Sequence, residues 1–192
     1  MNKKTLRMAT AEDAAALLAI YAPYVEDTSV SFEYTVPSIE EFAQRIKDTL
    51  QKHPFILCEV CGVPVGYAYA APFRTRAAYE WCVETSIYVS PSAHGAGVGR
   101  TLYEALLKVL ALQGVRTAYA CITHPNIPSE KFHASMGFSP IGVFKKVGYK
   151  QGVWHDLSWF EKQLKPFDNA PLPLTPVGEL EEKNLKEIFA GE

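Results

Sequence analysis

Apolar positions along this 192-residue chain follow two kinds of spacing, one typical of strands and one typical of helices. Short runs rich in β-branched and aromatic residues predict strands at residues 5–9, 55–61, 65–71, 83–89, 116–122, 143–149 and 153–160. Apolar residues spaced three and four apart predict helices at residues 14–21, 37–52, 102–110, 125–136 and, more weakly, 178–190. Pro23 is expected to end or kink the first helix. Strands and helices interleaved in this way predict a mixed α/β fold.

The clearest local signal is a strand, a glycine turn and a helix in direct succession. Residues 83–89 are typical of a buried strand, and the segment 90–92 stops it because Pro91 has no N–H for a ladder. Three glycines, at positions 95, 97 and 99, then lead into the helix. A helix N-terminus offers free N–H groups and the positive end of the dipole, and glycine lets a phosphate approach them. The turn predicts a phosphate-bearing cofactor; the alternative is a helix N-terminus that merely tolerates glycine.

Composition is typical of a soluble protein with one domain. A length of 192 residues suits one full core, and 48% hydrophobic with 21% charged residues is ordinary for a globular chain. A net charge of −2 argues against a nucleic-acid surface, and no apolar run approaches the roughly 20 residues of a membrane span. The first residues lack the apolar core of a signal peptide, so a cytoplasmic location is expected.

The four cysteines do not predict a metal site. Cys58 and Cys61 fall in a predicted strand, where residues three apart point to opposite faces. No second C-x-x-C pair and no nearby pair of histidines completes a zinc site around them. Buried, reduced thiols and no metal are therefore expected.

A change of composition divides the chain into two predicted parts, a domain at 1–164 and an extension at 165–192. The extension begins with four prolines within eleven residues, so its first half is expected to be extended. The weak helix that follows is expected to dock on the domain, to cross to a second subunit, or to fray. The sequence does not choose among these.

The glycine turn fits neither the G-x-G-x-x-G of dinucleotide folds nor a P-loop, because no Lys-Ser or Lys-Thr follows it. It resembles the acyl-CoA pyrophosphate loop of the GNAT-superfamily N-acetyltransferases, Q/R-x-x-G-x-G/A, with His94 replacing Gln or Arg. Asn126 and the later pair Gly137-Phe138 match a second GNAT segment, in which His133 takes the position of the usual tyrosine acid. The order of elements agrees over residues 5–163. The resemblance implies the GNAT acyl-CoA N-acyltransferase fold, a central mixed β-sheet flanked by helices, with acetyl-CoA as cosubstrate.

Three further stretches narrow the resemblance to the branch of phosphinothricin N-acetyltransferases and methionine sulfoximine/sulfone acetyltransferases. They are APFRTR at 71–76, YEWCVETSIYV at 79–89 and WHD at 154–156. The resemblance implies that Glu84 is the base and that Arg74 and Arg76 bind the substrate's acidic groups. The coenzyme A ligands that it implies are the backbone of Ile87, Tyr88 and Val89, together with His94, Gly95, Ala96, Gly97, Val98, Gly99, Arg100 and Asn126. It also implies a homodimer, and it leaves the role of His155 open.

Some of these roles also follow from the residues themselves. An amine must lose a proton before it attacks a thioester, and burial raises the pKa of a carboxylate such as Glu84 toward a useful range. No Ser or Cys nucleophile is then needed, and the backbone N–H of Val89 is a candidate for stabilising the developing oxyanion. The alternative for Glu84 is an exposed strand end. His133 is either an acid or a surface histidine.

Two pairs of residues are candidates for binding the acceptor. Arg74 and Arg76 point the same way in an extended chain, which suits a carboxylate together with a second oxo group. The alternative is a solvated basic turn. Phe32 and Tyr34 are expected either to contact the substrate or to form a lid over the core, since aromatic residues belong more often to cores.

We therefore predict an enzyme that transfers acetyl from acetyl-CoA to the α-amine of a small amino acid such as L-phosphinothricin, methionine sulfoximine or methionine sulfone. One rival is acetylation of a protein N-terminus or a polyamine, although the arginine pair argues against a polyamine. Another is a non-catalytic CoA-binding sensor, which has no use for Glu84. The expected partner is a small molecule, with no nucleic acid and no membrane.

Overall fold

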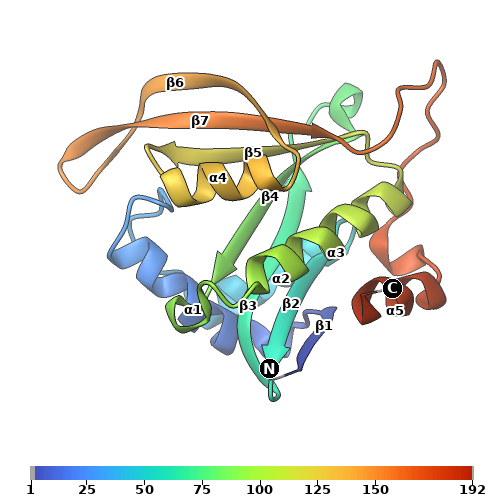
Figure 1. Ribbon diagram of the computed structural model, residues 1–192, viewed down its shortest axis with the longest axis horizontal. Helices are drawn as coiled ribbons and strands as arrows, with labels where there is room; N and C mark the ends of the chain where they lie inside the picture. Colours follow the sequence, from blue (N-terminus) through green and yellow to red (C-terminus); the bar gives the residue numbers. More distant parts are fainter. Residues whose placement is uncertain (1–2, 192) are drawn as a thin grey trace.

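The computed structural model describes residues 3–191, in which one β-sheet carries helices on both faces (Figure 1). In this part of the chain seven strands form the sheet, in the order β1-β2-β3-β4-β5-β7-β6. Their bounds are β1 Lys4–Met8, β2 Phe55–Val60, β3 Val63–Pro72, β4 Cys82–Val89, β5 Thr117–His124, β6 Ser139–Lys150 and β7 Val153–Gln163. Strands β4 and β5 are parallel and the other neighbours antiparallel, so the sheet is mixed, as predicted.

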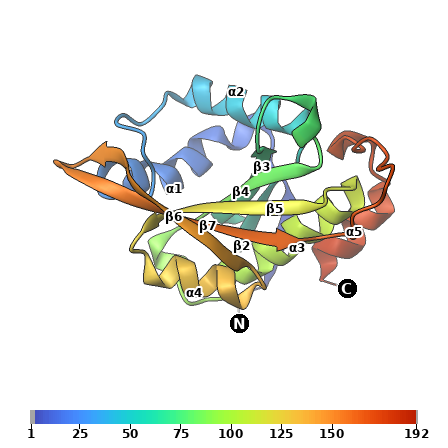
Figure 2. The ribbon, with the colours of Figure 1, turned by 90° about the horizontal axis from the view of Figure 1, so that it is seen from above.

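The α-helices divide between the two faces of the sheet. Their bounds are α1 Ala14–Glu26, α2 Ile39–Leu50, α3 Val98–Gln113, α4 Ile127–Ser135 and α5 Glu182–Ala190. Short 3-10 turns lie at Ala11–Asp13, Ala77–Tyr79, Pro91–Ala93 and Val177–Glu179. Helices α1 and α2 cover one face, and α3, α4 and α5 lie on the other (Figure 2).

Each face has its own apolar core. Leu17 of α1 and Ile46 of α2 are fully buried against Tyr67 of β3 on one side. Leu102 and Leu106 of α3 are fully buried on the other side. Alternation along the strands supplies apolar side chains to both faces, so that the neighbours Ile56 and Leu57 of β2 belong to different cores.

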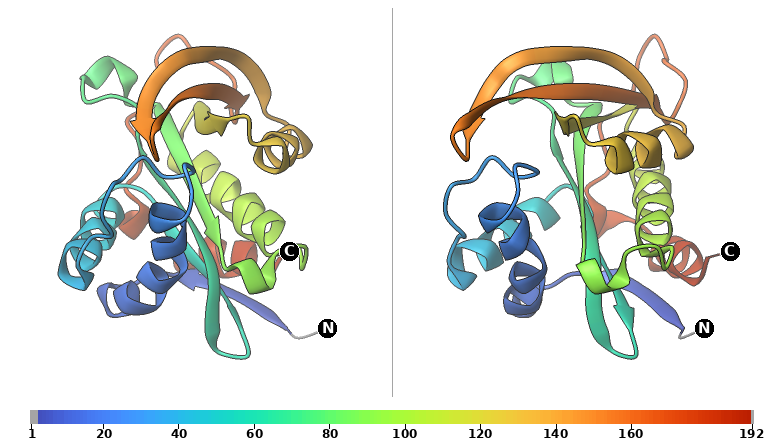
Figure 3. Two further views of the ribbon diagram at one scale, coloured as in Figure 1. Left: turned by 90° about the vertical axis from the view of Figure 1, so that its left-hand side faces the viewer. Right: turned by 60° about the vertical axis from the view of Figure 1, so that its left-hand side comes forward.

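The two central strands pair only briefly. Residues 82–84 of β4 pair with residues 117–119 of β5, and the described chain shows no further pairing between these strands. Beyond this point β4 remains paired with β3, whereas β5 is paired with β7 along its whole length. The two halves of the sheet therefore diverge, and the β6–β7 hairpin lies over the start of β4 (Figure 3).

Several element boundaries differ from the sequence prediction, among them those of α1 and β6. Helix α1 continues past Pro23 for one turn, and the N–H of Asp27 donates to the carbonyl of Pro23 at 2.9 Å. Burial of Val25, which is 1% exposed, offsets the hydrogen bond that the proline cannot make. Strand β6 begins at Ser139 instead of 143, because pairing with β7 extends it beyond its apolar run.

The cysteines are only partly as predicted. All four are free, and Cys58 is buried, but Cys61 is exposed in the turn between β2 and β3, where its φ is 53°. Within residues 3–191, no three or more His, Cys, Asp and Glu side chains gather as a metal site would require. In the same range, no helix combines the length and apolarity needed to span a bilayer.

The C-terminal extension docks on the domain, which is one of the three outcomes that the sequence left open. The indole N–H of Trp81 donates to the carbonyl of Leu172 at 2.8 Å. The side-chain amide of Gln113 donates to the carbonyl of Thr175, also at 2.8 Å. Helix α5 then packs against α3 and β1 (Figure 1). Trp81 therefore anchors the extension.

Candidate active site

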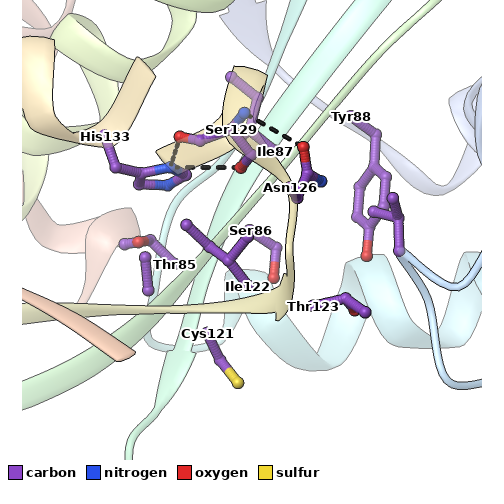
Figure 4. A pocket seen from close by; sticks show the side chains of 12 residues that line it. Thr85, Ser86, Ile87, Tyr88, Cys121, Ile122, Thr123, Asn126, Ser129 and His133 are labelled. Carbon is purple, nitrogen blue, oxygen red and sulfur yellow. Dashed lines mark hydrogen bonds between the residues drawn. The ribbon is translucent and has the colours of Figure 1, made fainter. Parts of the chain in front are cut away.

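A cleft enters the sheet where β4 and β5 separate (Figure 4). We call its deepest part the inner cavity, which measures 70 Å³ and is lined by Val30, Thr85, Ser86, Ile87, Tyr88, Ala120, Cys121, Ile122, Thr123, Asn126, Ser129 and His133. The outer cavity measures 530 Å³ and extends along the glycine turn to Phe132 of α4. Val30, Ile87, Asn126 and Ser129 line both cavities, so the two form one continuous site.

Backbone groups of β4 face this cleft. The N–H of Ser90, the residue after β4, donates to the carbonyl of Val65. Every second residue before it, such as Tyr88 and Ser86, therefore directs its backbone groups to β3. The N–H and C=O groups of Ile87 and Val89 consequently point toward β5, from which β4 has separated. An extended ligand can pair with such groups as an added strand would.

The glycine turn has the conformation that suits an anion. Gly95 and Gly97 have φ values of 76° and 75°, which side chains rarely allow. A Cβ on Gly99 would lie 3.6 Å from Phe132 and 3.7 Å from Ile87, so bare backbone faces the outer cavity. The first-turn N–H groups of α3 and its dipole therefore favour a pyrophosphate in this cavity.

The rest of the predicted coenzyme segment also lies at the outer cavity. All residues of 94–100 line it except Ala96. The Nε2 atom of His94 lies 3.0 Å from the carbonyl oxygen of Val89, which also accepts the hydroxyl of Tyr24 at 2.6 Å. These contacts fasten the glycine turn to the end of β4, and they give His94 a structural partner that the sequence did not predict.

Glu84 stands where the two strands separate, at the last pair in which they meet, opposite Tyr119. Burial raises the pKa of its carboxyl above the usual range, and the charge of Arg74 acts in the opposite direction. Glu84 lines neither cavity, but its charge raises the pKa of Cys121, which lines the inner one, in addition to the larger effect of burial. A raised pKa is what a base for an amine requires near neutral pH.

The two predicted acceptor arginines follow the end of β3 and are exposed. The guanidinium of Arg74 lies 4.4 Å from the ring centroid of Phe73 and donates to the carbonyl of Phe73 at 3.0 Å. Neither arginine lines the cleft. Arg74 is linked to the cleft through its charge on Glu84, whereas Arg76 has no such link.

His133 is only 4% exposed, so the alternative of a surface histidine is wrong. Its Nδ1 atom lies 2.8 Å from the carbonyl of Ser129, and its Nε2 atom lies 3.0 Å from the hydroxyl of Tyr103. The Tyr103 hydroxyl lies 2.6 Å from Oγ1 of Thr85. Although the ring of His133 borders the inner cavity, protein groups occupy both its nitrogens. Burial lowers its pKa, so the neutral ring is favoured.

Tyr103 is the residue that the sequence analysis missed. It falls in the apolar stripe of α3 beside Leu102 and Leu106, where a tyrosine is expected to belong to the core. Its hydroxyl, however, connects α3 to both β4 and α4. The one available signal was a hydroxyl in a buried stripe, since such a group requires a partner.

The remaining predicted residues divide between the cleft and its surroundings. Asn126 lines both cavities, and its Oδ1 accepts the N–H of Ser129 at 3.2 Å, which caps α4. Phe32 and Tyr34 do not line the cleft. Phe32 packs on the end of β6, and Tyr34, 71% exposed, donates its hydroxyl to the carbonyl of Tyr149. Both therefore attach their segment to the β6–β7 hairpin.

A sheet split between parallel strands, with a glycine turn and a helix N-terminus beside the split, suits an extended ligand that carries a phosphate. Residues 6–159 match the family model described as an acetyltransferase (GNAT) domain. The chain belongs to the GNAT family of acetyltransferases, as the sequence motifs predicted.

Relatives place the chain more narrowly within that family. It is 35% identical to phosphinothricin N-acetyltransferase of Streptomyces viridochromogenes, over 91% of this chain and 95% of that one. It is 32% identical to an L-methionine sulfoximine/L-methionine sulfone acetyltransferase of Salmonella typhimurium, over 83% and 94% of the two chains. A phosphinothricin acetyltransferase from Sinorhizobium meliloti, solved with acetyl-CoA, superposes with a TM-score of 0.83 at 32% identity, over 91% of this chain and 98% of that one.

Proposed function

We propose that this acetyltransferase uses acetyl-CoA to acetylate the α-amine of a small amino acid with a second oxo group, such as L-phosphinothricin, methionine sulfoximine or methionine sulfone. The observation that carries the proposal is the position of Glu84. Its half-buried carboxyl stands where β4 and β5 separate, and the charge of Arg74 acts on it. The names of the relatives support the same class of acceptor.

The outer cavity fits the coenzyme. Glycine backbone at the start of α3 would hold the pyrophosphate, and the outward-facing N–H and C=O of Ile87 would pair with the pantetheine arm. The thioester supplies an activated carbonyl carbon. The N–H of Val89 is our candidate for stabilising negative charge on the carbonyl oxygen.

Proton transfers are assigned to two sides of β4. Glu84 accepts the proton that the acceptor's ammonium loses, directly or through one water. The free amine then adds to the thioester carbonyl, its nitrogen loses a second proton, and the tetrahedral adduct breaks its C–S bond. We assign the relay of that second proton to the departing sulfur to the hydroxyl of Thr85, which lines the inner cavity and is held by Tyr103. His133 holds the Tyr103 hydroxyl and is a positioning residue in this scheme.

Direct attack by the amine requires no acyl-cysteine, although Cys121 lines the inner cavity. Burial raises the pKa of its thiol to about 12, so the nucleophilic thiolate is scarce at neutral pH. Cys121→Ala is therefore expected to keep kcat within roughly 3-fold of the unmodified enzyme. Steady-state kinetics with acetyl-CoA and one good acceptor check this. Ping-pong kinetics that vanish in the variant would show that Cys121 carries the acetyl group.

The effect of Arg74 on Glu84 predicts a shift in the pH profile. Because the charge of Arg74 lowers the pKa of Glu84, Arg74→Gln is expected to raise that pKa. Less of the base is then ionised at acidic pH, so the acid limb of kcat/KM moves to higher pH. Arg76→Gln is the matched control, since it removes an equivalent guanidinium and leaves the acid limb in place. If the acid limb of kcat/KM lay at the same pH in both variants, Glu84 would not be the group whose ionisation sets that limb.

The proposed acceptor class is tested by following thiol release from acetyl-CoA with a panel of amines. The panel holds phosphinothricin, methionine sulfoximine, methionine sulfone, methionine, glutamate, spermidine and a short peptide. Turnover concentrated on the oxo-bearing amino acids supports the proposal. Turnover with spermidine or peptide alone would support an acetyltransferase but contradict the proposed acceptor class. Binding of acetyl-CoA without any turnover would favour a sensor.

We also propose that the enzyme is a cytoplasmic homodimer. The β6–β7 hairpin exposes apolar side chains that a second copy would cover: Ile141, Phe144, Val147 and Trp154, each about half exposed. Trp154→Arg is expected to weaken self-association by placing a charge in that surface. Sedimentation velocity measures the self-association of the variant and of the unmodified enzyme. An unmodified enzyme that remains monomeric at micromolar concentration would contradict the proposal.

A further inference from the structure

The most unusual buried group outside the proposed chemistry is a lysine. Lys150 ends β6 next to the turn into β7, between the strands predicted at 143–149 and 153–160, and it is only 4% exposed. Its ammonium donates to the carbonyl of Val25 at 2.6 Å and to the carbonyl of Ser31 at 2.7 Å. Neither partner is a carboxylate.

Burying an ammonium group is costly unless hydrogen bonds replace its water. The two carbonyls that do so come from different parts of the chain. Val25 lies in the last turn of α1, where the helix dipole favours a cation, and Ser31 lies in the loop that leads to α2. Lys150 thus bridges the end of α1, the loop and the β6–β7 hairpin, three segments that are distant in sequence.

Other contacts hold the same loop, which we call the 28–36 segment. A Cβ on Gly148 would overlap the ring of Phe32, so that ring rests directly on the backbone of β6. The hydroxyl of Thr123 donates to the carbonyl of Ser29 at 2.6 Å. His155, whose role the sequence left open, has its Nε2 3.0 Å from the carbonyl of Lys150 and so holds the hairpin turn.

The 28–36 segment reaches the active site through Val30, which lines both the inner and the outer cavity. Val30 precedes the residue whose carbonyl Lys150 holds. We propose that Lys150 is a positioning residue, whose buried ammonium fixes the 28–36 segment and thereby holds Val30 against the cleft. The catalytic role of Val30 at the cleft rests on the proposed function, whereas the anchoring of the 28–36 segment by Lys150 does not.

The test compares Lys150→Met with the unmodified full-length enzyme. Methionine keeps much of the length and removes the donors. Native-state hydrogen exchange is expected to accelerate roughly 10-fold or more at amides of the 28–36 segment, with little change in β2 and β3. The acceptor KM is expected to rise by a similar factor, and more than kcat falls.

Lys162→Met is the matched control, because the ammonium of Lys162 donates to the carbonyl of Met136 at 2.5 Å, away from this segment. It is expected to leave exchange at 28–36 unchanged. Should Lys150→Met fail to fold, Gly148→Ala displaces the ring of Phe32 without touching the lysine, and it is expected to give the same local exchange. Lys150→Arg, which keeps the charge, is expected to recover part of the protection.

The outcomes separate the two proposals. Uniform acceleration across the sheet in Lys150→Met, or an unchanged 28–36 segment, would overturn the positioning role and leave a contribution to global stability alone. Local acceleration with an unchanged acceptor KM would overturn the link to the active site. If no amino acid is acetylated by the unmodified enzyme, the proposed function fails, while the exchange experiment still decides whether Lys150 anchors the segment.

Discussion

Replacing Glu84 with glutamine is expected to lower kcat by roughly 10²- to 10³-fold, the usual contribution of a positioned general base. Glutamine keeps the size and hydrogen-bonding capacity of the side chain but cannot accept the proton of an ammonium group. KM for acetyl-CoA is expected to stay within about 2-fold, because Glu84 does not line the outer cavity. The acid limb of the pH profile is expected to disappear with the carboxylate.

The sheet itself offers a matched control for this substitution. Tyr119 of β5 pairs with Glu84 on one side and with Glu161 of β7 on the other, so the two glutamates lie in one row. Glu161→Gln is expected to keep kcat within about 2-fold, as usual for a change outside the site. Thermal unfolding of Glu84→Gln should occur at the temperature of the unmodified protein or slightly above it, since glutamine avoids the cost of ionising a partly buried carboxyl. Glu161→Gln should match the unmodified protein. Unimpaired acetylation by Glu84→Gln would show that another group is the base.

How far the sequence predicted this site depends on how local each signal is. The glycine turn combines a strand, three glycines and an apolar helix within a short stretch, so its position and anion-binding geometry could be predicted. The partial burial of Glu84 could be predicted for the same reason, because it follows from the predicted strand around this residue. The match to the GNAT family confirms the fold that these motifs predicted.

Features that depend on contacts between distant segments could not be predicted from the sequence. His133 is buried by the rings of Phe138, which directly precedes β6, and Phe160 of β7. Its hydroxyl partner, Tyr103, lies thirty residues earlier on α3, where an apolar stripe hides its polar role. Lys150 falls between two predicted strands, and the approach of α1 and the 28–36 segment buries it. In each case the chemistry depends on packing between elements that periodicity alone does not place.

Gly99→Leu is expected to weaken acetyl-CoA binding by roughly 100-fold or more, which corresponds to about 2.7 kcal/mol. A Cβ at this position would already touch Phe132 and Ile87 across the outer cavity. The longer side chain would fill the space that the pyrophosphate and the pantetheine arm need. Leucine favours helix more than glycine does, so the loss is not expected to come from unfolding of α3.

Gly99→Ala is the matched control. Its Cβ would meet ordinary van der Waals contacts of 3.6 and 3.7 Å, and the backbone at this position needs no positive φ. Alanine should therefore bind acetyl-CoA within about 3-fold of the unmodified protein and stabilise α3 by roughly 0.5–1 kcal/mol. Isothermal titration with acetyl-CoA and thermal unfolding of both variants check these values. Equal loss of affinity in the two would mean that the turn needs glycine for its backbone alone, and full affinity in Gly99→Leu would place the coenzyme elsewhere.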